Sequence, residues 1–558
     1  MSITRRKFIQ MLSLAAGGAA FASFTPAALA KALRSGGKNL TSFSGLGNLT
    51  LVHTTDTHAQ LVPIYYREPD TNTGVGKDKL RPPHLTGKAF LQYYGYSPDT
   101  REAYAYTCDD YAKLAREYGK MGGFAYLATL IKGIREERPG KVLHIDGGDT
   151  VQGSATSLWT KGEDMITAMN KLGCEVMTGH WEFTYGQDRL NELIKKMDFP
   201  FVAQNVNDAT WGDPVFKPYV IKQVNGLAVA VIGQAFPYTP IANPGRFIPD
   251  WSFGIKDGHM QNVVDEIRAK KADLIVVLSH NGMDVDKKMA ARVKGIDVIM
   301  GGHTHDGVPR PVKVGDTLVI NSGCYGKFVS RLDLQVKNRK IENYSYRLIP
   351  VICNLIEPNH EMEKLVSDLR APYKDKLGEV LGHTETLLYR RGNVDGTFDN
   401  LICDALRDHY DVEFALSPGF RWGRTVPTGP ITAEDVYSQT AITYPDTYKA
   451  SMKGSMIKSV LEDIADNLFN PDPYMQQGGD MVRSKGLEFT LYAEKPTGQR
   501  IQDLLVRGKP VEPGKEYTMA GWASMTDQPG PPVYDIVIDY IKRKKTINIR
   551  NKKPLLVD

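Results

Sequence analysis

Cysteine is scarce in this sequence, with five residues among 558, and no two of them form a CxxC pair. This spacing excludes a cysteine-based zinc site, and an odd, scattered set excludes the disulfide framework of small secreted domains. Buried thiols are the expected state, and one disulfide is the alternative. The five residues are Cys108, Cys174, Cys324, Cys353 and Cys403.

Long hydrophobic runs are missing beyond the first thirty residues. Residues 4–9 read TRRKFI, the twin-arginine pattern, and a mild apolar run interrupted by two glycines leads to Ala-Leu-Ala at 28–30. These features are typical of a twin-arginine signal peptide with a small-residue cleavage site. We predict that residues 1–30 are removed on export and that the mature periplasmic protein, from about Lys31, has no membrane segment. The alternative, an N-terminal membrane anchor, needs a longer apolar run.

An excess of charge of one sign is also missing. The formal net charge of +5 falls to +2 without the three basic residues of the signal segment. A nearly neutral protein gives no reason to expect nucleic-acid binding. Internal repeats and low-complexity tracts are absent from the sequence, and its 42% hydrophobic content is that of an ordinary soluble globular protein.

The chain is too long for one hydrophobic core, and its pattern divides it into two domains. Residues 46–350 alternate short apolar strands with helical runs, including strands at 226–234 and 317–336, which predicts an α/β domain. A linker helix is expected at 351–373. Residues 374–558 mix helices (401–409, 455–468) with short strands (487–492, 517–521), which predicts an α+β second domain.

A tyrosine-rich insertion, residues 62–123, separates the first two strands of the first domain. Long loops in compact domains are usually functional or disordered, and so many aromatic side chains argue against disorder. We expect this insertion to wall the ligand cleft. A packed surface excursion without substrate contact is the alternative.

Five apolar runs of the first domain end in histidine or aspartate beside small residues. The carboxyl ends of parallel strands gather along one edge of a sheet, where the ligand sites of open α/β sheets lie. These five strand ends are therefore expected to converge on one point. The runs are LVHTTDTHA (51–59), KVLHIDGGDTVQGS (141–154), EVMTGHWEF (175–183), DLIVVLSHNG (273–282) and DVIMGGHTHD (297–306).

The residue types at these ends suit divalent metal ions. Asp56 and His58 are two residues apart, as are His303 and His305, so both members of each pair can reach one ion. A carboxylate between two sets of imidazoles suits two first-row ions about 3.5–4 Å apart, with Asp149 bridging them. Two histidines inside strands are expected only to pack: His53 and His144.

The segments DTHAQ, GGDTVQGS, TGHWEFTYG, LSHNG and GGHTHD resemble, in this order, the metal motifs of calcineurin-like metallophosphoesterases, in the branch shared with bacterial 5′-nucleotidases. GTFDNLICDAL and SPGFRWGRTV are similar to segments of the nucleotidase second domain. The resemblance implies a β-sandwich flanked by helices, followed by a 5′-nucleotidase C-terminal-like domain. It also implies two metal sites that share Asp149. Asp56, His58 and His305 would hold one ion, and His180, His280 and His303 would hold the other.

The segment GHWEFT, residues 179–184, departs from the family pattern GNHEFD. His180 replaces an asparagine ligand, a place that imidazole can fill. Trp181 and Thr184 replace the catalytic histidine and the aspartate that orients it. General-acid catalysis is typically worth about 10²–10⁴-fold, so its loss points to a leaving group that needs no proton. Thiolates and persulfides leave as anions far more readily than alkoxides.

This departure, the signal segment and the two-domain layout together resemble the SoxB family, the thiosulfohydrolases of periplasmic thiosulfate oxidation. The resemblance implies that a hydroxide bridging two divalent ions attacks a sulfonate held on a cysteine of the SoxYZ carrier and releases sulfate. Manganese is the first expectation for the ions, with zinc or iron as alternatives. A monomer with SoxYZ as its partner is expected.

The second domain supplies the candidate substrate residues. Arg421 and Arg424 could hold sulfonate oxygens through bidentate hydrogen bonds, and interdomain salt bridging is the alternative for both. Arg421 and Trp181 are the candidate catalytic residues, and Tyr444 is a further candidate for substrate binding. Trp181 could close the pocket or only fill the vacated histidine space. Two other functions stay open: an exported 5′-nucleotidase or cyclic phosphodiesterase, and a non-catalytic metal-binding carrier.

Overall fold

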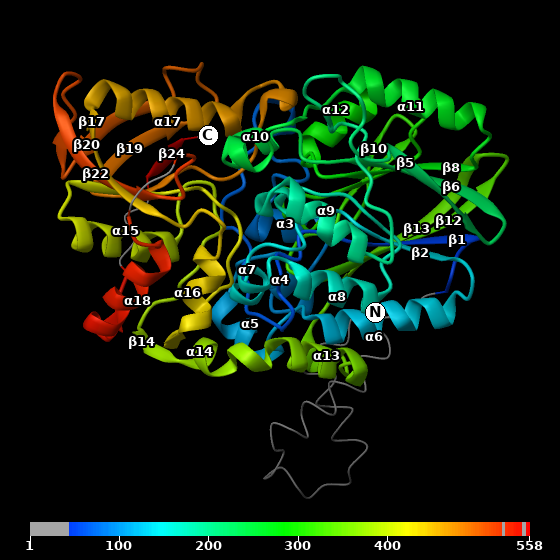
Figure 1. Cartoon of the computed structure of the whole chain (residues 1–558), viewed down its shortest axis with the longest axis horizontal. Helices are drawn as coiled ribbons and strands as arrows, with labels where there is room; N and C mark the ends of the chain where they lie inside the picture. The colour runs from blue at the N-terminus through cyan, green and yellow to red at the C-terminus, as the bar shows by residue number, and fades with distance from the viewer. Residues whose placement is uncertain (1–43, 527–529, 550–553, 558) are drawn as a thin grey trace, which may run out of the picture.

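The computed structural model describes residues 44–526, 530–549 and 554–557 (Figure 1). The expected signal peptide, residues 1–30, lies outside these described residues. Within the described ranges, no helix combines the length and the apolar character needed to cross a membrane.

Two β-sheets packed face to face form the centre of the first domain. Their facing sides share one core of fully buried aliphatic side chains, such as Leu51 of β1 and Val276 of β8. The first sheet has the order β13 (Lys340–Pro350), β12 (Phe328–Lys337), β1 (Leu49–Thr54), β2 (Val142–Asp146), β3 (Val176–Met177). The second has the order β10 (Val312–Val314), β11 (Thr317–Asn321), β9 (Val298–Gly301), β8 (Leu274–Ser279), β6 (Leu227–Gln234), β5 (Tyr219–Val224).

Helices cover the outer side of each sheet and complete the sandwich (Figure 1). Apolar side chains of α6 (Phe124–Glu137), α8 (Glu163–Leu172) and α9 (Gln187–Lys196) pack with the first sheet. Those of α11 (Asp257–Ala269) and α12 (Met283–Arg292) pack with the second. The expected β-sandwich flanked by helices is therefore confirmed.

Strand direction brings the polar strand ends together. Strands β1, β2 and β3 run parallel in the first sheet, and β6, β8 and β9 run parallel in the second. The strands that carry the five motifs are divided between two sheets, whereas a single sheet edge was the expectation. Because the two sheets are packed face to face, their carboxyl edges are adjacent, and the strand ends still meet.

The tyrosine-rich insertion contains three short helices, α3 (Gly87–Tyr94), α4 (Arg101–Tyr106) and α5 (Tyr111–Tyr118). Its tyrosine rings are largely buried, and Tyr106 stacks on Phe328 with ring centroids 5.0 Å apart. The buried Lys327 Nζ binds the carboxylate of Glu68 and anchors the start of the insertion to β12. The insertion is therefore a packed part of the first domain.

Within its described residues, the second domain contains three small sheets and four main helices. The expected helices 401–409 and 455–468 are confirmed as α15 and α17, and the expected strands 487–492 and 517–521 as β19 and β22. The helices are α15 (Thr397–Tyr410), α16 (Ala433–Thr440), α17 (Gly454–Phe469) and α18 (Val533–Lys544). One sheet has the order β16 (Gly429–Thr432), β14 (Val380–Thr384), β23 (Thr546–Ile547). The next has the order β17 (Thr447–Lys453), β22 (Glu516–Trp522), β15 (Phe414–Ser417), β18 (Arg483–Lys485). The third has the order β21 (Lys509–Pro510), β20 (Ile501–Val506), β19 (Leu487–Tyr492), β24 (Leu555–Val557).

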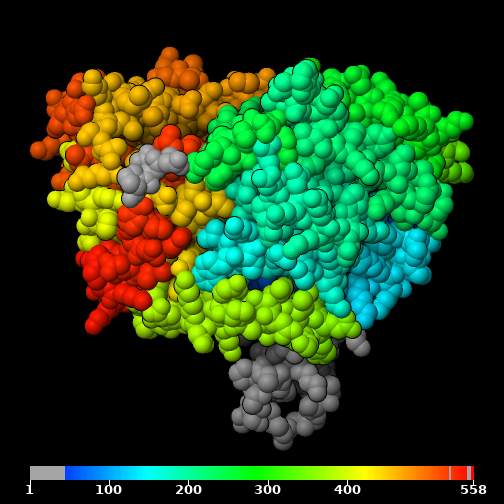
Figure 2. Space-filling view, viewed as in Figure 1, coloured from blue at the N-terminus to red at the C-terminus, as the bar shows by residue number. Residues whose placement is uncertain are grey.

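The segment between the domains is helical. Helix α13 (His360–Arg370) packs Met362 and Val366 into the first-domain core before α14 (Lys374–Gly378) leads to β14. Figure 2 shows this yellow-green segment along the lower edge of both domains, which touch each other above it. All five cysteines are within the described residues and have free thiols, so no disulfide joins them.

Candidate metal centre

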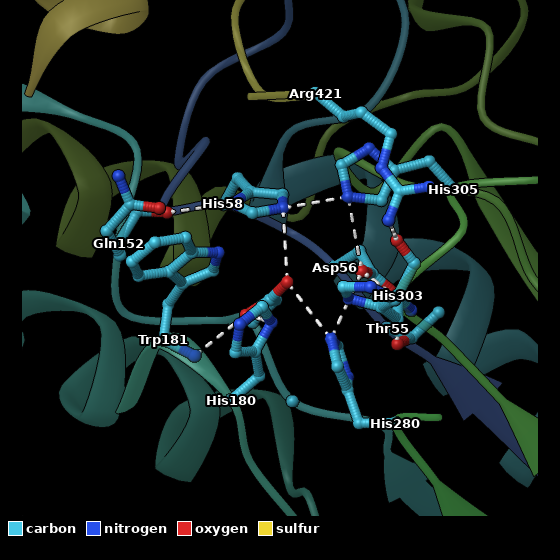
Figure 3. A network of polar contacts seen from close by, with 12 residues as sticks. Thr55, Asp56, His58, Gln152, His180, Trp181, His280, His303, His305 and Arg421 are labelled. Carbon is cyan, nitrogen blue, oxygen red and sulfur yellow. Dashed lines mark hydrogen bonds and ion pairs between the residues drawn. The ribbon is translucent and has the colours of Figure 1, made fainter. Parts of the chain in front are cut away.

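Seven polar side chains meet where five strands end, between the two sheets and the second domain (Figure 3). Each comes from a short turn directly after an apolar strand, which is how residues far apart in the sequence reach one point. Asp56 and His58 follow β1, Asp149 follows β2, His180 follows β3, His280 follows β8, and His303 and His305 follow β9.

These side chains form two groups with one shared member, Asp149. Within each group the possible ligand atoms lie within 4.8 Å of one another. The Asp149 Oδ2 atom is 3.0 Å from His280 Nε2 and 3.5 Å from His58 Nε2. Its Oδ1 atom is 3.3 Å from His180 Nδ1. The groups are Asp149, His180, His280 and His303, and Asp56, His58, Asp149 and His305.

The donor chemistry of the groups fits two divalent cations. The Nε2 atom of His180 and the Nδ1 atom of His305 are buried without a hydrogen-bond partner in the described chain, a state that typically costs about 1–3 kcal/mol each. Burial lowers the pKa of His180 to about 4 and lowers that of His305, so both imidazoles are neutral and can act as ligands. Burial also raises the pKa of Asp56 to about 8, and a bound cation would restore its carboxylate.

The backbone of the ligand turns is strained. Asp56, His58, Asp149, His303 and His305 all adopt left-handed conformations, with φ of 51°, 44°, 57°, 74° and 62°. For residues with a Cβ atom this conformation costs roughly 1–2 kcal/mol, so it persists only where the surrounding structure holds it. Strain concentrated on five of the seven residues is typical of a functional site.

Outer hydrogen bonds orient the rings. The Nδ1 atoms of His280 and His58 lie 2.6 Å from the Gly147 carbonyl oxygen and 3.2 Å from that of Gln152. Donation to these carbonyls leaves each Nε2 atom as a lone-pair donor that faces the group. The turn glycines are needed here, because a Cβ atom on Gly302 would lie 2.7 Å from Asp56 Oδ2 and 3.1 Å from His280 Nδ1.

Glu182 is a functional residue that sequence reasoning missed. Its fully buried carboxylate accepts hydrogen bonds from the backbone N–H groups of Thr150 (2.7 Å), His180 (2.8 Å) and Asp149 (3.2 Å). It therefore holds the β2 and β3 turns in register with each other. The signal that could have found it is an acidic residue inside the same motif as His180, in an otherwise apolar stretch.

A cavity of about 210 Å³ separates the two groups from the second domain, and Trp181 lines it. The backbone N–H of Trp181 donates to Asp149 Oδ1 at 2.9 Å, while its indole packs edge-on against Trp422 and Phe420. We call this space the front cavity. Its second-domain wall is aromatic, with Arg421 beside it.

The three second-domain candidates take different positions. Arg421 lines the front cavity and donates from Nη2 to the His303 carbonyl at 2.6 Å (Figure 3). Arg424 does not line it, because its guanidinium pairs with Glu434 at 3.3 Å and Asp435 at 3.2 Å. Tyr444 does not line it either, and its hydroxyl donates to the Ala242 carbonyl at 2.6 Å. The expectation of substrate binding by Arg424 and Tyr444 is corrected accordingly.

The tyrosine-rich insertion contributes none of the described residues that line the front cavity. Its rings are used in packing against the first-domain core, which corrects the expectation that it walls the cleft. His53 and His144 also stay outside both groups: they are buried inside β1 and β2, next to the hydroxyls of Ser322 (2.6 Å) and Thr54 (3.1 Å).

Comparison with known proteins agrees with this architecture. Residues 49–307 match the family model of calcineurin-like phosphoesterases, and residues 380–528 match that of the 5′-nucleotidase C-terminal domain. The structure of the sulfate thiohydrolase SoxB of Thermus thermophilus, in complex with glycerol, is 36% identical and superposes with a TM-score of 0.89. The match covers 92% of this chain and 98% of that one. The chain belongs to the SoxB family.

More distant relatives of this SoxB-family chain include Protein UshA and a 5′-nucleotidase precursor. Protein UshA of Escherichia coli (strain K12) is 26% identical over 460 residues, which cover 72% of this chain and 81% of UshA. A 5′-nucleotidase precursor of Thermus thermophilus has the same fold, with a TM-score of 0.72 at 22% identity over 91% of this chain and 99% of that one.

In this SoxB-family chain, the positions of the missing acid dyad are filled by other contacts. The Trp181 indole belongs to the aromatic wall. The Thr184 hydroxyl lies 2.7 Å from that of Thr443, in the second domain. Both residues therefore contact the second domain.

Proposed function

We propose that this protein is a dimetal hydrolase that releases sulfate from a cysteine S-thiosulfonate on the SoxYZ carrier. The observation that carries the proposal is a front cavity without an available general acid. Outside the two ligand groups, three of the lining side chains titrate, and each is engaged. Tyr238 donates to the Tyr474 carbonyl, Arg421 donates to His303, and Asp480 pairs with Arg483 at 3.0 Å.

A cavity of this kind suits a leaving group that departs as an anion. Two divalent ions, when bound, would act as Lewis acids that activate water and neutralise developing charge. Asp149 would hold both ligand groups in register through its two carboxylate oxygens. Arg421 has N–H groups left for sulfonate oxygens, a charge-assisted contact. The rings of Trp181, Phe420 and Trp422 exclude water and provide an apolar surface for the departing persulfide.

The proposal extends to place, partner and metal. The twin-arginine segment would direct the folded protein to the periplasm, where the carrier's cysteine arm would enter the front cavity. Manganese is the proposed metal, with zinc or iron as alternatives that the same aspartate and histidine ligands accept.

The decisive experiment offers two substrates to the mature, metal-loaded protein. One is SoxYZ carrying a cysteine S-thiosulfonate, with sulfate measured by ion chromatography; the other is AMP, with phosphate measured. Sulfate release with AMP unchanged is the expected result. Brisk phosphate release with an unchanged carrier would favour the nucleotidase, and no product from either substrate would favour a non-catalytic metal-binding protein.

The nucleotidase or cyclic phosphodiesterase is the second candidate, because the match to the 5′-nucleotidase C-terminal domain favours it. Restoring the acid dyad with Trp181→His and Thr184→Asp separates the two candidates. If the missing acid sets the preference, the double variant gains phosphoesterase activity over Trp181→His alone, which controls for the space left by the indole. An unchanged phosphoesterase rate in the double variant would contradict the leaving-group argument.

A further inference from the structure

A second, smaller cavity adjoins the front cavity. It encloses about 70 Å³ against about 210 Å³ for the front cavity. Its walls come from the insertion (Asn72, His84), from the first domain (Val285, Asp306) and from the second domain (Arg391, Arg421). We call it the rear chamber. None of the roles assigned above explains why so many charged groups of three segments enclose it.

The two cavities share a thin wall. His303, Arg421 and the Gly478–Gly479 turn line both of them. Gly478 adopts a left-handed conformation with φ of 81°, and a Cβ atom there would clash with His303 Nε2 and lie 3.1 Å from Arg421 Nη2. At this point only the glycine backbone separates the two cavities, and Arg421 lines both of them.

Arg391 is a buried cation with incomplete pairing. Only 5% of its surface is exposed, yet its closest contacts are the Thr304 carbonyl at 3.2 Å and the Asp480 carboxylate at 3.5 Å. Its Nε atom is buried without a hydrogen-bond partner in the described chain. Its neighbour Arg390, equally buried, binds Asp399 through Nη2 at 2.8 Å and Nε at 3.1 Å. Leaving a buried charged donor unpaired is costly, so Arg391 has unused capacity for an acceptor.

The carboxylates around the rear chamber are shared among several cations. Asp284 lies 2.6 Å from His84 Nε2 and 2.7 Å from Lys287 Nζ. Asp480 pairs with Arg483 at 3.0 Å and with Arg391 at 3.5 Å, while Asp306 accepts a hydrogen bond from Asn72 at 3.0 Å and lies 3.9 Å from Arg391. Three guanidinium groups, of Arg391, Arg421 and Arg483, therefore face two carboxylates, of Asp306 and Asp480, and an anion between Arg391 and Arg421 would offset the excess positive charge.

We propose that the rear chamber is a second oxyanion site, which binds one tetrahedral dianion of the sulfate class between Arg391 and Arg421. The space equals that of about two water molecules at ~30 Å³ each, which suits an ion of a few heavy atoms and excludes a nucleotide. Its use as a product site rests on the proposed function: released sulfate held there would leave the front cavity free for the carrier. The site itself does not depend on that function.

Selenate tests the location directly, because it has the shape of sulfate and selenium is visible by anomalous diffraction. Crystals of the metal-loaded protein soaked in selenate are expected to show selenium between Arg391 and Arg421. The peak is expected to persist in Arg424→Gln, a matched control whose equally buried guanidinium pairs with two carboxylates, and to vanish in Arg391→Gln. Selenium only beside the histidine groups, or nowhere in the protein, would overturn the proposal.

Calorimetric titration with sulfate at constant ionic strength is the second measurement. Val285→Met extends a side chain into the rear chamber and changes no charge, so it tests the site even if Arg391→Gln folds poorly. Val285→Met and Arg391→Gln are each expected to weaken sulfate binding at least tenfold. Arg424→Gln is expected to leave sulfate binding unchanged. Equal affinity in wild type and Val285→Met would contradict the site. The protein could bind sulfate in the rear chamber and still leave thiosulfonated carrier unchanged. This result would uphold the site and overturn only the proposed function.

Discussion

The front cavity has two walls that differ in origin and in chemistry. The first-domain wall includes four histidines and Asp149, each within a few residues of a strand end, together with Trp181 and Phe236. The second-domain wall is formed by Phe420, Arg421 and Trp422 on the loop between β15 and β16, and by residues 477–480 on the loop before β18. The first wall has ligands for cations, and the second has the groups that would meet a substrate.

This division shows how the superfamily fold can change its chemistry. The ligand wall is held by strained turns and by Glu182, so nearly any change there affects the ions. The substrate wall is a separate layer. Trp181 and Thr184 stand at the positions where the family pattern has an acid dyad, and here both contact the second domain. Under the proposed function, the change of leaving group needs replacement of only a few residues between the walls.

The largest effect is expected from Asp149→Ala, which removes the one residue shared by both ligand groups. Metal ions typically contribute several kcal/mol to transition-state stabilisation, so sulfate release should fall about 10³-fold. Elemental mass spectrometry should show a loss of bound metal. Asp286→Asn is the matched control, because Asp286 is equally buried but binds Ser279 and Asn281 outside both groups. A surviving rate in the alanine variant would remove Asp149 from its proposed role.

Glu182→Ala tests whether support of the turns matters as much as the ligands themselves. It leaves three backbone N–H groups without their acceptor, which should lower the free energy of unfolding by about 3 kcal/mol and weaken metal binding roughly 10- to 100-fold. Glu182→Gln keeps one acceptor oxygen and should fall between wild type and Glu182→Ala. Chemical denaturation and metal titration measure the two effects. Equal values for wild type and Glu182→Ala would show that the turns are held without it.

Arg421→Gln tests the second wall alone. Loss of a charge-assisted hydrogen bond is worth about 1.5–3 kcal/mol, so kcat/KM for the thiosulfonated carrier should fall roughly 10- to 100-fold with metal content unchanged. Arg424→Gln removes the same charge three residues away, where it pairs with Glu434 and Asp435, and should leave kcat/KM within a few-fold. If the two variants behave alike, the assignment of Arg421 to the cavity is wrong.

The smallest effect is expected where the insertion meets α12. Burial disfavours the charged form of His84, but Asp284 beside it raises its pKa above the ordinary value. A raised pKa means that the contact stabilises the fold fully below pH about 6.5 and that this stabilisation is lost as the pH rises through the raised pKa. His84→Gln should therefore cost about 1 kcal/mol at pH 6 and less at pH 9, measured by chemical denaturation. His360→Gln, at a site where 93% of the side chain is exposed, is the matched control for the loss of an imidazole.

Local patterns in the sequence determined much of the molecule. The apolar runs, the small residues after them and the positions of Asp56, His58, Asp149, His180, His280, His303 and His305 were all readable, because a strand and the turn that ends it are encoded by neighbouring residues. For the same reason the helices α15 and α17 were expected where they occur.

Tertiary structure decided the rest. The division of the ligand strands between two sheets, the support from Glu182, the separate positions of Arg421 and Arg424, and the rear chamber all depend on contacts between segments far apart in the chain. Two arginines three residues apart look equivalent in a sequence, yet one meets His303 and the other meets Glu434. Which of them faces the cavity is set by the packing of the second domain on the first, and that packing is a sum of many side-chain contacts that no local pattern contains.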